Sequence, residues 1–508
     1  MRALLVTSVG VTCAAALTLP LAAPASSAPV LSAASARPPS LTTEPGTDTT
    51  DTSGTTAPDT TTTSDTTAPD GAEPRAAKSA AAPAGSTQSL PLAPLAVPSN
   101  RVTGAPAVQG LPQRDARPFS LVGVVWDDAE AELHGTVQVR TRATGTTRWS
   151  DWQDVETHNA DHAADLGSAE REGRTVRGAT APLWVGDSDG VEVRVRPESP
   201  AAPESPGSQD RAATPVPLPE GMRLELVDPG EDPAPEPARG APANRAAVPA
   251  VFADTPPTAA LPEVLTAEIA AASAVNAEVA EIGASVIPAL TQAETAESVN
   301  LAPGAKPYIG PRPRIVTRKG WGADEKLRER NFGYTKSVKA AFVHHSATGN
   351  NYTCKQAPSV LRSIYRYHVK SSGWRDFGYN FAVDKCGNIY EGRAGGVTKA
   401  VLGAHTLGFN TNTMGIAVLG SYGSTNPPAA AVTAVSKLTA WKLGLFGANP
   451  KGKVTLVSGG SNKYKKGVKV KMNVISGHRD GFATECPGAR LYKKLGTART
   501  SSAKLQGR

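Results

Sequence analysis

Residues 477–488 read GHRDGFATECPG, and they place His478 eight residues before Cys486. The histidine follows a short apolar run typical of a strand, and the cysteine lies in a loop that contains glycine. Far upstream, an apolar run that begins at Ala340 ends in a second histidine, His344. One thiolate and two imidazoles from separate segments supply three ligands for a tetrahedral Zn²⁺, and the fourth position then remains for water. The pattern therefore predicts a zinc site.

The adjacent residue, His345, is a competing candidate for this site. Successive side chains of a β-strand face opposite sides of the sheet, so only one of the two neighbouring histidines can face a metal. We assign His344 to the metal.

The pairing of the cysteines decides whether Cys486 can bind a metal. The chain has four cysteines. Cys13 lies in the apolar N-terminal segment and is lost if that segment is cleaved. The three that remain are an odd number for an oxidising compartment, where two can pair. Cys354 and Cys386 flank one compact segment, so we expect them to form a disulfide and to leave Cys486 as a thiolate ligand. A disulfide that used Cys486 would rule out the zinc interpretation.

The first 25 residues predict an export signal. Arg2 gives a short positive region, residues 3–21 are apolar, and Ala23-Pro24-Ala25 is a small-residue cleavage site. A membrane anchor is the alternative, but Pro20 and the cleavage site favour removal. No other stretch approaches the roughly 20 apolar residues of a spanning helix. We expect a secreted protein, extracellular or associated with a cell wall, with no stable membrane span.

The next two segments differ in composition. Residues 26–114 are rich in Thr, Ser, Pro and Ala and have few large apolar side chains, so we expect them to be disordered. Residues 115–228 contain short alternating apolar runs separated by turn residues, which predicts an all-β, sandwich-like domain. Trp149 and Trp152 in this domain are candidates for stacking on sugar rings or, alternatively, for packing in the core. We find no catalytic constellation here.

The remaining segments lead into and form a second domain. Residues 229–305 are rich in Pro and Ala and predict a linker with room for one weakly amphipathic helix. Residues 306–497 alternate between buried-type strands and helices, which predicts an α/β fold with a mixed β-sheet flanked by helices. Residues 498–508 are expected to form a flexible basic tail.

Charge is divided unevenly along the chain. From residue 306 to the C-terminus there are 34 Lys and Arg residues against 8 Asp and Glu residues, whereas the rest of the chain is acidic. A domain this basic attracts polyanions. For an exported protein, the polyanions met first are the anionic polymers of a cell wall, so we expect no nucleic-acid partner. Much of the excess lies in lysines between 463 and 471, for which a solvated hairpin is the simpler explanation.

The C-terminal region also contains a series of short motifs. In chain order they are WGAD (321–324), VHHSA (343–347), GW (373–374) with His368 before it, DFGYNF (376–381), GNIYEGR (387–393), GAH (403–405), NTMGI (412–416), GHRD (477–480) and TECPG (484–488). In these motifs and their order, residues 306–495 resemble a peptidoglycan recognition protein domain, a branch of the type-2 N-acetylmuramoyl-L-alanine amidases. The resemblance says nothing about residues 26–305.

The resemblance implies that His344, His478 and Cys486 hold Zn²⁺. Members that bind peptidoglycan without cutting it typically lack this cysteine, so its presence here implies catalysis. Tyr379 matches a tyrosine that approaches the metal, and we expect its phenol to stabilise the oxyanion that develops on the amide. Thr484 stands where the phage branch of the family has a lysine. We expect Thr484 to orient water or substrate, and this departure leaves the proton-transfer partner open.

The expected reaction is hydrolysis of the amide bond between N-acetylmuramic acid and L-alanine, because Zn²⁺ activates water and polarises a carbonyl. His368, Trp374 and His405 are expected to shape the groove that binds the muramyl peptide of peptidoglycan or, alternatively, to support the metal ligands. Arg393 is expected to bind oxygens of the muramyl peptide or, alternatively, to form a surface salt bridge. We expect the protein to act as a monomer.

Two other function classes fit parts of the pattern. One is a non-catalytic recognition protein with the same fold, which binds muropeptide and releases no product. The other is a hydrolase in which Cys486 is the nucleophile and His478 its base. Chelation and thiol alkylation distinguish the two catalytic schemes, because a thiol nucleophile needs no metal.

Overall fold

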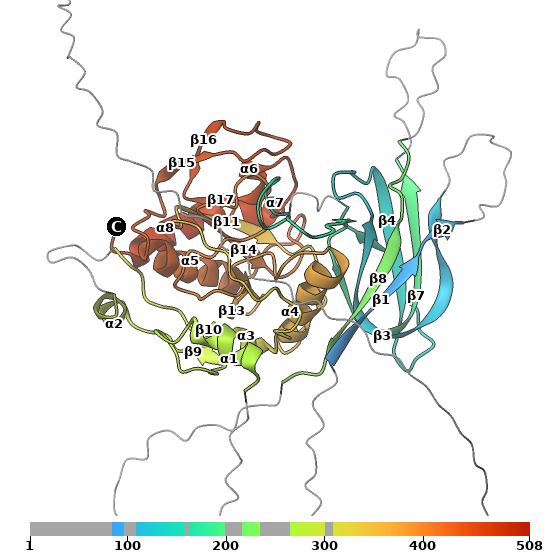
Figure 1. Cartoon of the computed structure of the whole chain (residues 1–508), viewed down its shortest axis with the longest axis horizontal. Helices are drawn as coiled ribbons and strands as arrows, with labels where there is room; N and C mark the ends of the chain where they lie inside the picture. Colours follow the sequence, from blue (N-terminus) through green and yellow to red (C-terminus); the bar gives the residue numbers. More distant parts are fainter. Residues whose placement is uncertain (1–83, 96–107, 158–161, 199–215, 234–264, 300–307) are drawn as a thin grey trace, which may run out of the picture. The chain divides into compact units, whose positions relative to one another are not determined.

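The computed structural model describes residues 84–95, 108–157, 162–198, 216–233, 265–299 and 308–508 (Figure 1). The expected export signal and most of the segment expected to be disordered lie outside these ranges. None of the helices within the described ranges is long and apolar enough to cross a membrane.

The N-terminal domain is an antiparallel sheet in which β1-β8-β3-β7-β4-β5 are successive neighbours, with β2 and β6 also paired to β3. Its strands are β1 (Ala84–Pro91), β2 (Ala93–Pro94), β3 (Gln109–Trp126), β4 (Gly135–Ala143), β5 (Gln153–Val155), β6 (Gly178–Ala179), β7 (Leu183–Pro197) and β8 (Arg223–Gly230). Buried and more exposed positions alternate along β4, and Val137 and Val139 share a buried cluster with Val191 and Val193 of β7. This alternation is the signal that predicted an all-β domain, and the structure confirms that fold class.

Strand β3 lies between β8 and β7 and pairs with both. Its residues 121–125 pair with β8, and residues 109–122 pair with β7 through three register shifts. The sheet begins at Ala84 rather than near residue 115, where the first domain was expected to start, because β1 pairs with β8 along its length. The sequence of β1, AGSTQSLP, has a single large apolar residue, so no alternation marks it as a strand.

The C-terminal domain is built on a mixed sheet with the strand order β17-β11-β14-β12-β13-β10-β9. Its strands are β9 (Val286–Ile287), β10 (Ile315–Val316), β11 (Ala340–His345), β12 (Phe381–Val383), β13 (Ile389–Glu391), β14 (Thr413–Val418) and β17 (Ile475–Gly477), and a separate hairpin pairs β15 (Lys453–Val457) with β16 (Lys469–Asn473). β11 lies between β14 and β17, parallel to both, and all its residues are buried. Burial on both faces is typical of such a strand.

Helices cover both faces of this sheet, which confirms the α/β prediction. They are α3 (Arg318–Trp321), α4 (Ala357–Arg366) with a π-helical turn (Tyr367–Ser371), α5 (Ala429–Gly444), α6 (His478–Gly481), α7 (Ala489–Tyr492) and α8 (Leu495–Leu505). Ala341 and Val343 of β11 share a buried cluster with Leu438 of α5 and Ala498 of α8. Ala417 of β14 belongs to a second cluster, which contains the apolar face of α4.

Two segments expected to be loose are ordered parts of this domain. Helix α8 occupies most of the expected tail at 498–508, and the Ser502 hydroxyl lies 2.7 Å from that of Thr439 in α5. The expected linker at 229–305 contributes α1 (Ala267–Ala274), α2 (Gln292–Glu297) and β9, which pairs with β10. These elements are short and rich in small residues, so they carry little apolar periodicity for sequence reasoning to detect.

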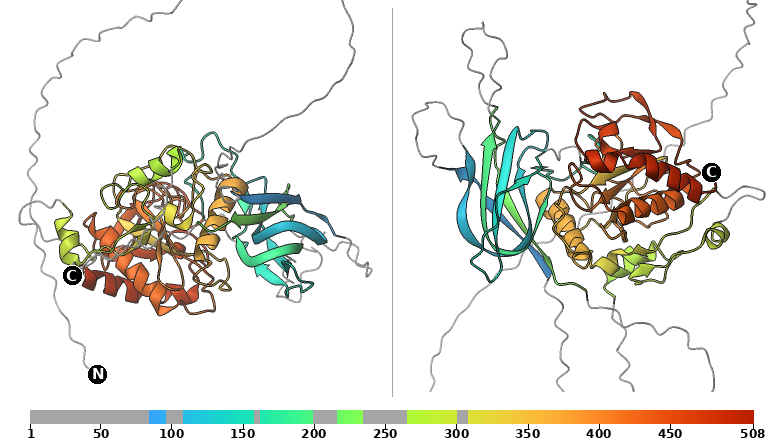
Figure 2. Two further views of the ribbon diagram at one scale, coloured as in Figure 1. Left: turned by 90° about the horizontal axis from the view of Figure 1, so that it is seen from below. Right: turned by 180° about the vertical axis from the view of Figure 1, so that it is seen from behind.

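Helix α4 also packs against the N-terminal domain. It contacts β8 and β3, beside which it lies in Figures 1 and 2. Leu121 and Val125 of β3 share one buried cluster with Ile364 and Tyr367. Gly123 lies between them on β3, and a Cβ at this position would be 2.4 Å from the Tyr367 hydroxyl. Glycine is therefore required here by the close approach of the two domains.

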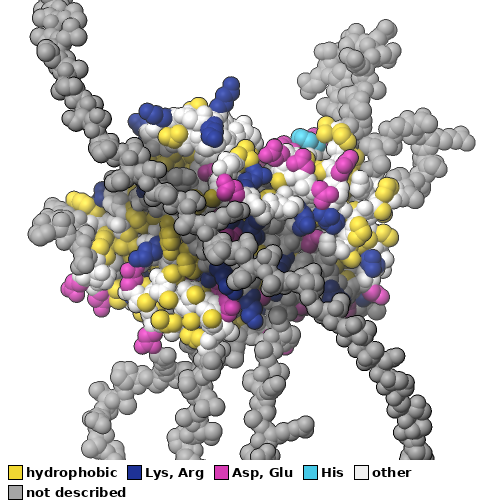
Figure 3. Space-filling view, viewed as in Figure 1, with side chains coloured by type: hydrophobic (Ala, Val, Ile, Leu, Met, Phe, Trp, Pro, Cys, Tyr) yellow, Lys and Arg dark blue, Asp and Glu magenta, His cyan; other side chains and the backbone are white. Residues whose placement is uncertain are grey.

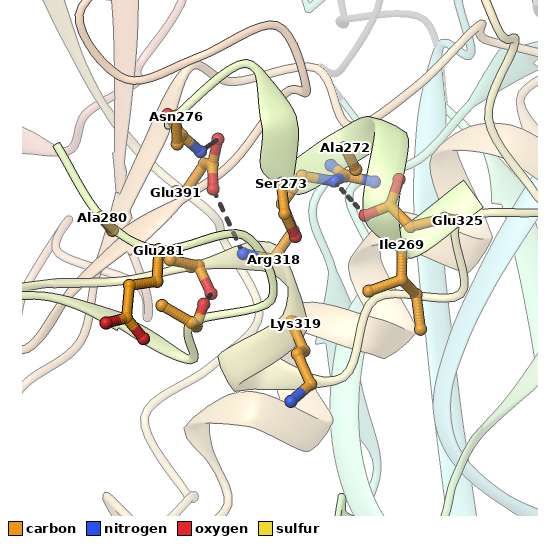
Figure 4. Close-up of a pocket in the computed structure, with 12 residues that line it drawn as sticks. Ile269, Ala272, Ser273, Asn276, Ala280, Glu281, Arg318, Lys319, Glu325 and Glu391 are labelled. Atoms are coloured by element: carbon orange, nitrogen blue, oxygen red, sulfur yellow. Dashed lines mark hydrogen bonds and ion pairs between the residues drawn. The ribbon is translucent and has the colours of Figure 1, made fainter. Parts of the chain in front are cut away.

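A buried arginine links α3 to the rest of the C-terminal domain (Figure 4). Arg318 is 2% exposed; its Nε donates to Glu325 at 2.6 Å and its Nη1 donates to Asp376 at 3.1 Å. Its backbone N–H donates to the carboxylate of Glu391 in β13, which also accepts a hydrogen bond from Asn276. Each carboxylate is held in place by a donor that offsets part of the cost of its burial.

Replacing this arginine is expected to destabilise the C-terminal domain. Arg318→Met leaves the buried carboxylate of Asp376 without a cationic partner, while Glu325 keeps Arg328, so we expect the free energy of unfolding to fall by about 3 kcal/mol. Chemical denaturation followed by circular dichroism measures the change. Arg314→Met is the matched control, because Arg314 is exposed and such changes usually cost less than about 0.5 kcal/mol. Equal stability of the two variants would contradict the prediction.

Candidate metal centre

Three predicted ligands and one further histidine meet in a single cluster. The candidate ligand atoms of His162, His344, His478 and Cys486 all lie within 4.8 Å of one another, and all four residues are buried. His344 lies near the end of β11, His478 begins α6 directly after β17, and Cys486 follows in the next loop. His162 comes from the other domain, in the segment between β5 and β6. The cluster is therefore assembled from four separate points of the chain.

The alternation of side chains along β11 decides which of its two histidines faces the cluster. His345 points elsewhere: its Nδ1 accepts a hydrogen bond from the backbone N–H of Tyr422 at 3.3 Å, and its Nε2 lies 3.6 Å from the carboxylate of Glu156. The structure thus places His344 in the cluster and His345 outside it, as the period of a strand requires.

His344 presents one ring nitrogen to the cluster and the other to a hydroxyl. Its Nδ1 is 3.8 Å from Cys486 Sγ, and its Nε2 is 3.4 Å from the hydroxyl of Thr406. Burial lowers the pKa of His344 well below its usual range, and the neighbouring His478 lowers it further. A neutral imidazole whose remote nitrogen is held by a polar neighbour is suited to bind a cation through the other nitrogen.

The loop that carries Cys486 is held by its own backbone. The backbone N–H of Cys486 donates to the Thr484 hydroxyl at 3.1 Å, and its carbonyl accepts from the N–H of Arg479 in α6 at 3.0 Å. Cys354 and Cys386 form a disulfide, as expected, and Cys486 lies outside it. The disulfide therefore does not involve the sulfur of Cys486, which lies in the cluster.

The residues fit a tetrahedral, borderline-soft divalent cation. Zn–N bonds of about 2.0–2.1 Å and Zn–S bonds of about 2.3 Å place two nitrogen ligands about 3.3 Å apart, and a nitrogen and a sulfur about 3.6 Å apart. In the structure, His162 Nε2 lies 3.2 Å from His344 Nδ1 and 3.7 Å from Cys486 Sγ. Imidazole and thiolate are also ligand types that suit Zn²⁺. Both the spacing and the chemistry of the donors agree with such an ion.

The two residues expected to be catalytic lie in different surroundings. The ring of Tyr379 is 4% exposed, and its centroid is 5.3 Å from that of His344 and 5.7 Å from that of His162. The Thr484 hydroxyl accepts the hydrogen bond from the backbone of Cys486. Tyr379 thus lies against the cluster, whereas Thr484 supports the loop of one ligand.

His405, one of the residues expected to bind substrate, packs against His344 of the cluster. Its ring centroid is 5.4 Å from that of His344, and its Nδ1 is 3.0 Å from the hydroxyl of Thr406, which His344 also approaches. It is completely buried, and burial lowers its pKa well below the usual range. In this position, neutral His405 orients the hydroxyl that contacts His344.

The other three residues expected to bind substrate form a separate group. His368 and Trp374 are stacked, with ring centroids 4.3 Å apart, and both are buried. Arg393 donates through Nη1 to the carboxylate of Glu170 at 2.7 Å and through Nε to the carbonyl of Phe377 at 2.8 Å. Glu170 belongs to the N-terminal domain, so this arginine already has an acidic partner in the structure.

Sequence reasoning missed His162 altogether. It ends the polar run HNADH at 158–162, where no apolar pattern marks a strand or a helix, and it is 182 residues away from His344. The one available signal was the small number of histidines in the chain, eight, which makes each of them a candidate metal ligand. Nothing in the spacing of these residues indicates that the two domains come together at His162.

Comparison with known proteins agrees with this description of two domains. Residues 334–489 match the profile of a family described as N-acetylmuramoyl-L-alanine amidase, and residues 73–216 match one described as Rv3811 N-terminal galactose-binding domain-like. Peptidoglycan-recognition protein SC2 of Drosophila simulans is 30% identical over 185 residues, which are 36% of this chain and 85% of that protein. The chain belongs to the peptidoglycan-recognition protein family.

Further relatives match a similar share of the chain. The human protein N-acetylmuramoyl-L-alanine amidase is 30% identical over 194 residues, which are 36% of this chain and 28% of that protein. Among solved structures, Drosophila peptidoglycan-recognition protein LB matches 36% of this chain and 92% of its own chain, with 25% identity and a TM-score of 0.29. The family contains both amidases and proteins named for recognition.

The cluster leads to a direct prediction for metal binding. We expect chelator-treated protein to bind one equivalent of Co²⁺ and to develop a near-ultraviolet band from thiolate-to-metal charge transfer. Cys486→Ser removes this band and lowers Co²⁺ affinity at least about tenfold, because one ligand is lost. His345→Gln, at the next position on β11, is the matched control and leaves the band in place. A band that survives in Cys486→Ser would exclude this cysteine as a ligand.

Proposed function

We propose that this protein is a secreted, zinc-dependent N-acetylmuramoyl-L-alanine amidase that hydrolyses the bond between N-acetylmuramic acid and L-alanine in peptidoglycan. The observation that carries the proposal is the meeting of His344, His478 and Cys486 at one point of a domain that matches the amidase profile. Three ligands from the C-terminal domain are the usual protein contribution to a catalytic zinc site.

These three residues would hold Zn²⁺, which when bound supplies a Lewis acid that activates water and polarises the amide carbonyl. His344 enters the reaction as a neutral imidazole, because burial disfavours its charged form. Its tautomer and ring orientation are set by the hydroxyl of Thr406. The backbone contacts of Cys486 keep its sulfur aimed at the same point.

Tyr379 is the residue best placed to act on the substrate. Its buried ring lies against His344, in a region with little access to water. In such surroundings a phenol O–H directed at the developing oxyanion is worth far more than in bulk water. We assign Tyr379 the role of stabilising this negative charge, and we assign Thr484 to positioning the Cys486 loop.

His368, Trp374 and Arg393 form the proposed contacts to the muramyl peptide. The stacked pair offers an aromatic surface, and the Arg393 guanidinium offers paired donors that match a carboxylate. Its contact with Glu170 shows that an acidic group reaches this arginine in the present conformation.

Secretion and contact with anionic wall polymers belong to the same proposal. Secretion is supported by the N-terminal sequence and by the Cys354–Cys386 disulfide, which forms in an oxidising compartment. The hairpin of β15 and β16 carries exposed lysines, and Figure 3 shows basic side chains where Figure 1 places these strands. A cluster of this sign favours attraction to polyanions.

A non-catalytic recognition protein is the second candidate, and one observation favours it. His162 gives the cluster a fourth protein ligand atom, and a site with four protein ligands is typical of structural zinc. Under this alternative the domain binds muropeptide and releases no product.

The proposal is tested by mass spectrometry of peptidoglycan fragments incubated with the full chain. We expect free stem peptide and intact glycan, with cleavage lost on chelation and restored by Zn²⁺. Cleavage that persists in the metal-free protein would favour Cys486 as a nucleophile instead. Muropeptide binding without any product from the zinc-loaded protein or from its His162 variant would assign the chain to the recognition class.

A tyrosine variant tests the role of Tyr379. We expect Tyr379→Phe to lower kcat about 100-fold, the usual cost of removing one oxyanion donor, with metal affinity unchanged. Steady-state kinetics and Co²⁺ titration measure the two quantities. Tyr334→Phe is the matched control, because Tyr334 is half exposed in the same domain and bonds only the Gly395 carbonyl among the described contacts of its hydroxyl. Unchanged turnover in Tyr379→Phe would remove it from the mechanism.

A further inference from the structure

We propose that residues 162–177 of the N-terminal domain, here called the strap, hold the amidase inactive by placing His162 on the metal as a fourth protein ligand. This inference rests on the proposed function and adds a regulatory element to it. The position that the strap takes is the one that a catalytic zinc site leaves for water and substrate.

The position of His162 carries the first step of the argument. Its Nε2 is 3.2 Å from His344 Nδ1 and 3.7 Å from Cys486 Sγ, the separations of ligands that share one tetrahedral ion. Its ring centroid is 4.5 Å from that of His478, and the residue is 6% exposed. A histidine that reached this region by chance would not need to match the distances to two different ligand atoms.

The first anchor of the strap is Asp165, three residues after the histidine. Its Oδ1 accepts hydrogen bonds from the backbone N–H of Gly408 and from Asn410 Nδ2, both at 2.7 Å. The same amide group of Asn410 donates to the carbonyl of Ala163 at 2.9 Å. These contacts tie the start of the strap to the C-terminal domain and hold His162 in its place over the cluster.

The second anchor covers the proposed substrate contacts. Glu170 pairs with Arg393 at 2.7 Å, with both side chains largely buried. The backbone carbonyls of Glu170 and Glu172 both accept from the guanidinium of Arg375, each at 2.9 Å. The carboxylate of Glu170 thus occupies the donors that the proposed function assigns to an acidic group of the muramyl peptide, so strap and substrate compete for Arg393.

The end of the strap contacts the backbone that carries the aromatic residue Trp374. Arg174 Nη1 donates to the carbonyl of Trp374 at 3.0 Å. A Cβ at Gly373 would be 2.2 Å from the carbonyl oxygen of Thr175, so the two backbones are in close contact. One continuous segment therefore reaches the metal cluster, Arg393 and the backbone at Gly373 and Trp374.

The contacts that hold the strap differ in kind from those that hold the two domains together, which indicates that the strap can be released without separating the domains. The two domains are held together by an apolar cluster around α4, which includes Leu121 and Tyr367. The strap has no helix or strand of its own and is held mainly by hydrogen bonds and ion pairs, while Leu166 in its middle is 44% exposed. Segments with few buried apolar contacts open at lower free energy than the domains that carry them. The strap can thus leave the site while the domains stay docked.

The decisive experiment compares the full chain with its His162→Ala variant in a metal readout and in an activity readout. Loss of a ligand is expected to change the visible d–d absorption of the Co²⁺-loaded protein and to lower Co²⁺ affinity at least about tenfold. At saturating Zn²⁺, stem-peptide release by the variant is expected to exceed that of the wild type at least about tenfold, because the active fraction rises.

Two further variants separate the ligand from the rest of the strap. Glu170→Gln frees Arg393 of its acidic partner and keeps His162, so we expect faster hydrolysis with the Co²⁺ spectrum largely retained. His134→Ala is the matched control, since His134 is an exposed histidine of the same domain, and it is expected to behave as wild type in both readouts. Thermal unfolding midpoints show whether each variant is folded.

The possible results are distinguishable. An unchanged Co²⁺ spectrum and equal hydrolysis in His162→Ala would contradict the proposal that the strap inhibits the amidase through His162. A changed spectrum and weaker metal binding without hydrolysis by any variant would keep His162 as a ligand and would reject the proposed amidase function. Faster hydrolysis together with a changed spectrum supports both.

Discussion

The candidate site depends on the parallel pairing of β11 with β17. In this register Val343 is opposite Gly477, so the residues that follow them, His344 and His478, leave the same edge of the sheet side by side. No side-chain contact is needed to bring the two histidines together, because backbone hydrogen bonds fix their spacing. Ala341 and Val343, on the other face of β11, are buried in the apolar cluster with α5 and α8, and this burial fixes which side chains of the strand face the site. The loop after α6 then has only to return Cys486 to this edge.

Much of the C-terminal domain could be predicted from sequence, because its signals are local. The run that contains Phe342 and Val343 is apolar throughout, as buried parallel strands are. The period of a strand allowed only one of His344 and His345 to face the metal, and the family resemblance pointed to His344. The contacts that were missed are between segments far apart in the chain. Ser502 of α8 and the small residues of β1 contact partners far away in the chain, and no local sequence pattern indicates these contacts. His162 is the extreme case, since its neighbours lie in another domain.

The N-terminal domain has a more specific relation to the site than a spacer would have. The close approach of Gly123 to Tyr367 and the shared apolar cluster dock the sheet on α4, and residues 162–177 of the same domain contact the C-terminal domain through Asp165 and Glu170. The same domain therefore supplies a rigid contact and a polar covering segment. An apolar interface beside a segment held mainly by polar contacts is an arrangement in which one part can move while the other keeps its register.

That His162 is delivered by the same chain has a consequence for how the proposed inhibition responds to dilution. An inhibitory group joined to its target has an effective concentration set by the connecting segment, typically in the millimolar range for short connections, whatever the concentration of the protein. Dilution, which dissociates a separate inhibitor, leaves such a contact intact. The fraction of molecules freed from the proposed inhibition would then be independent of the protein concentration, because release is an event within one chain.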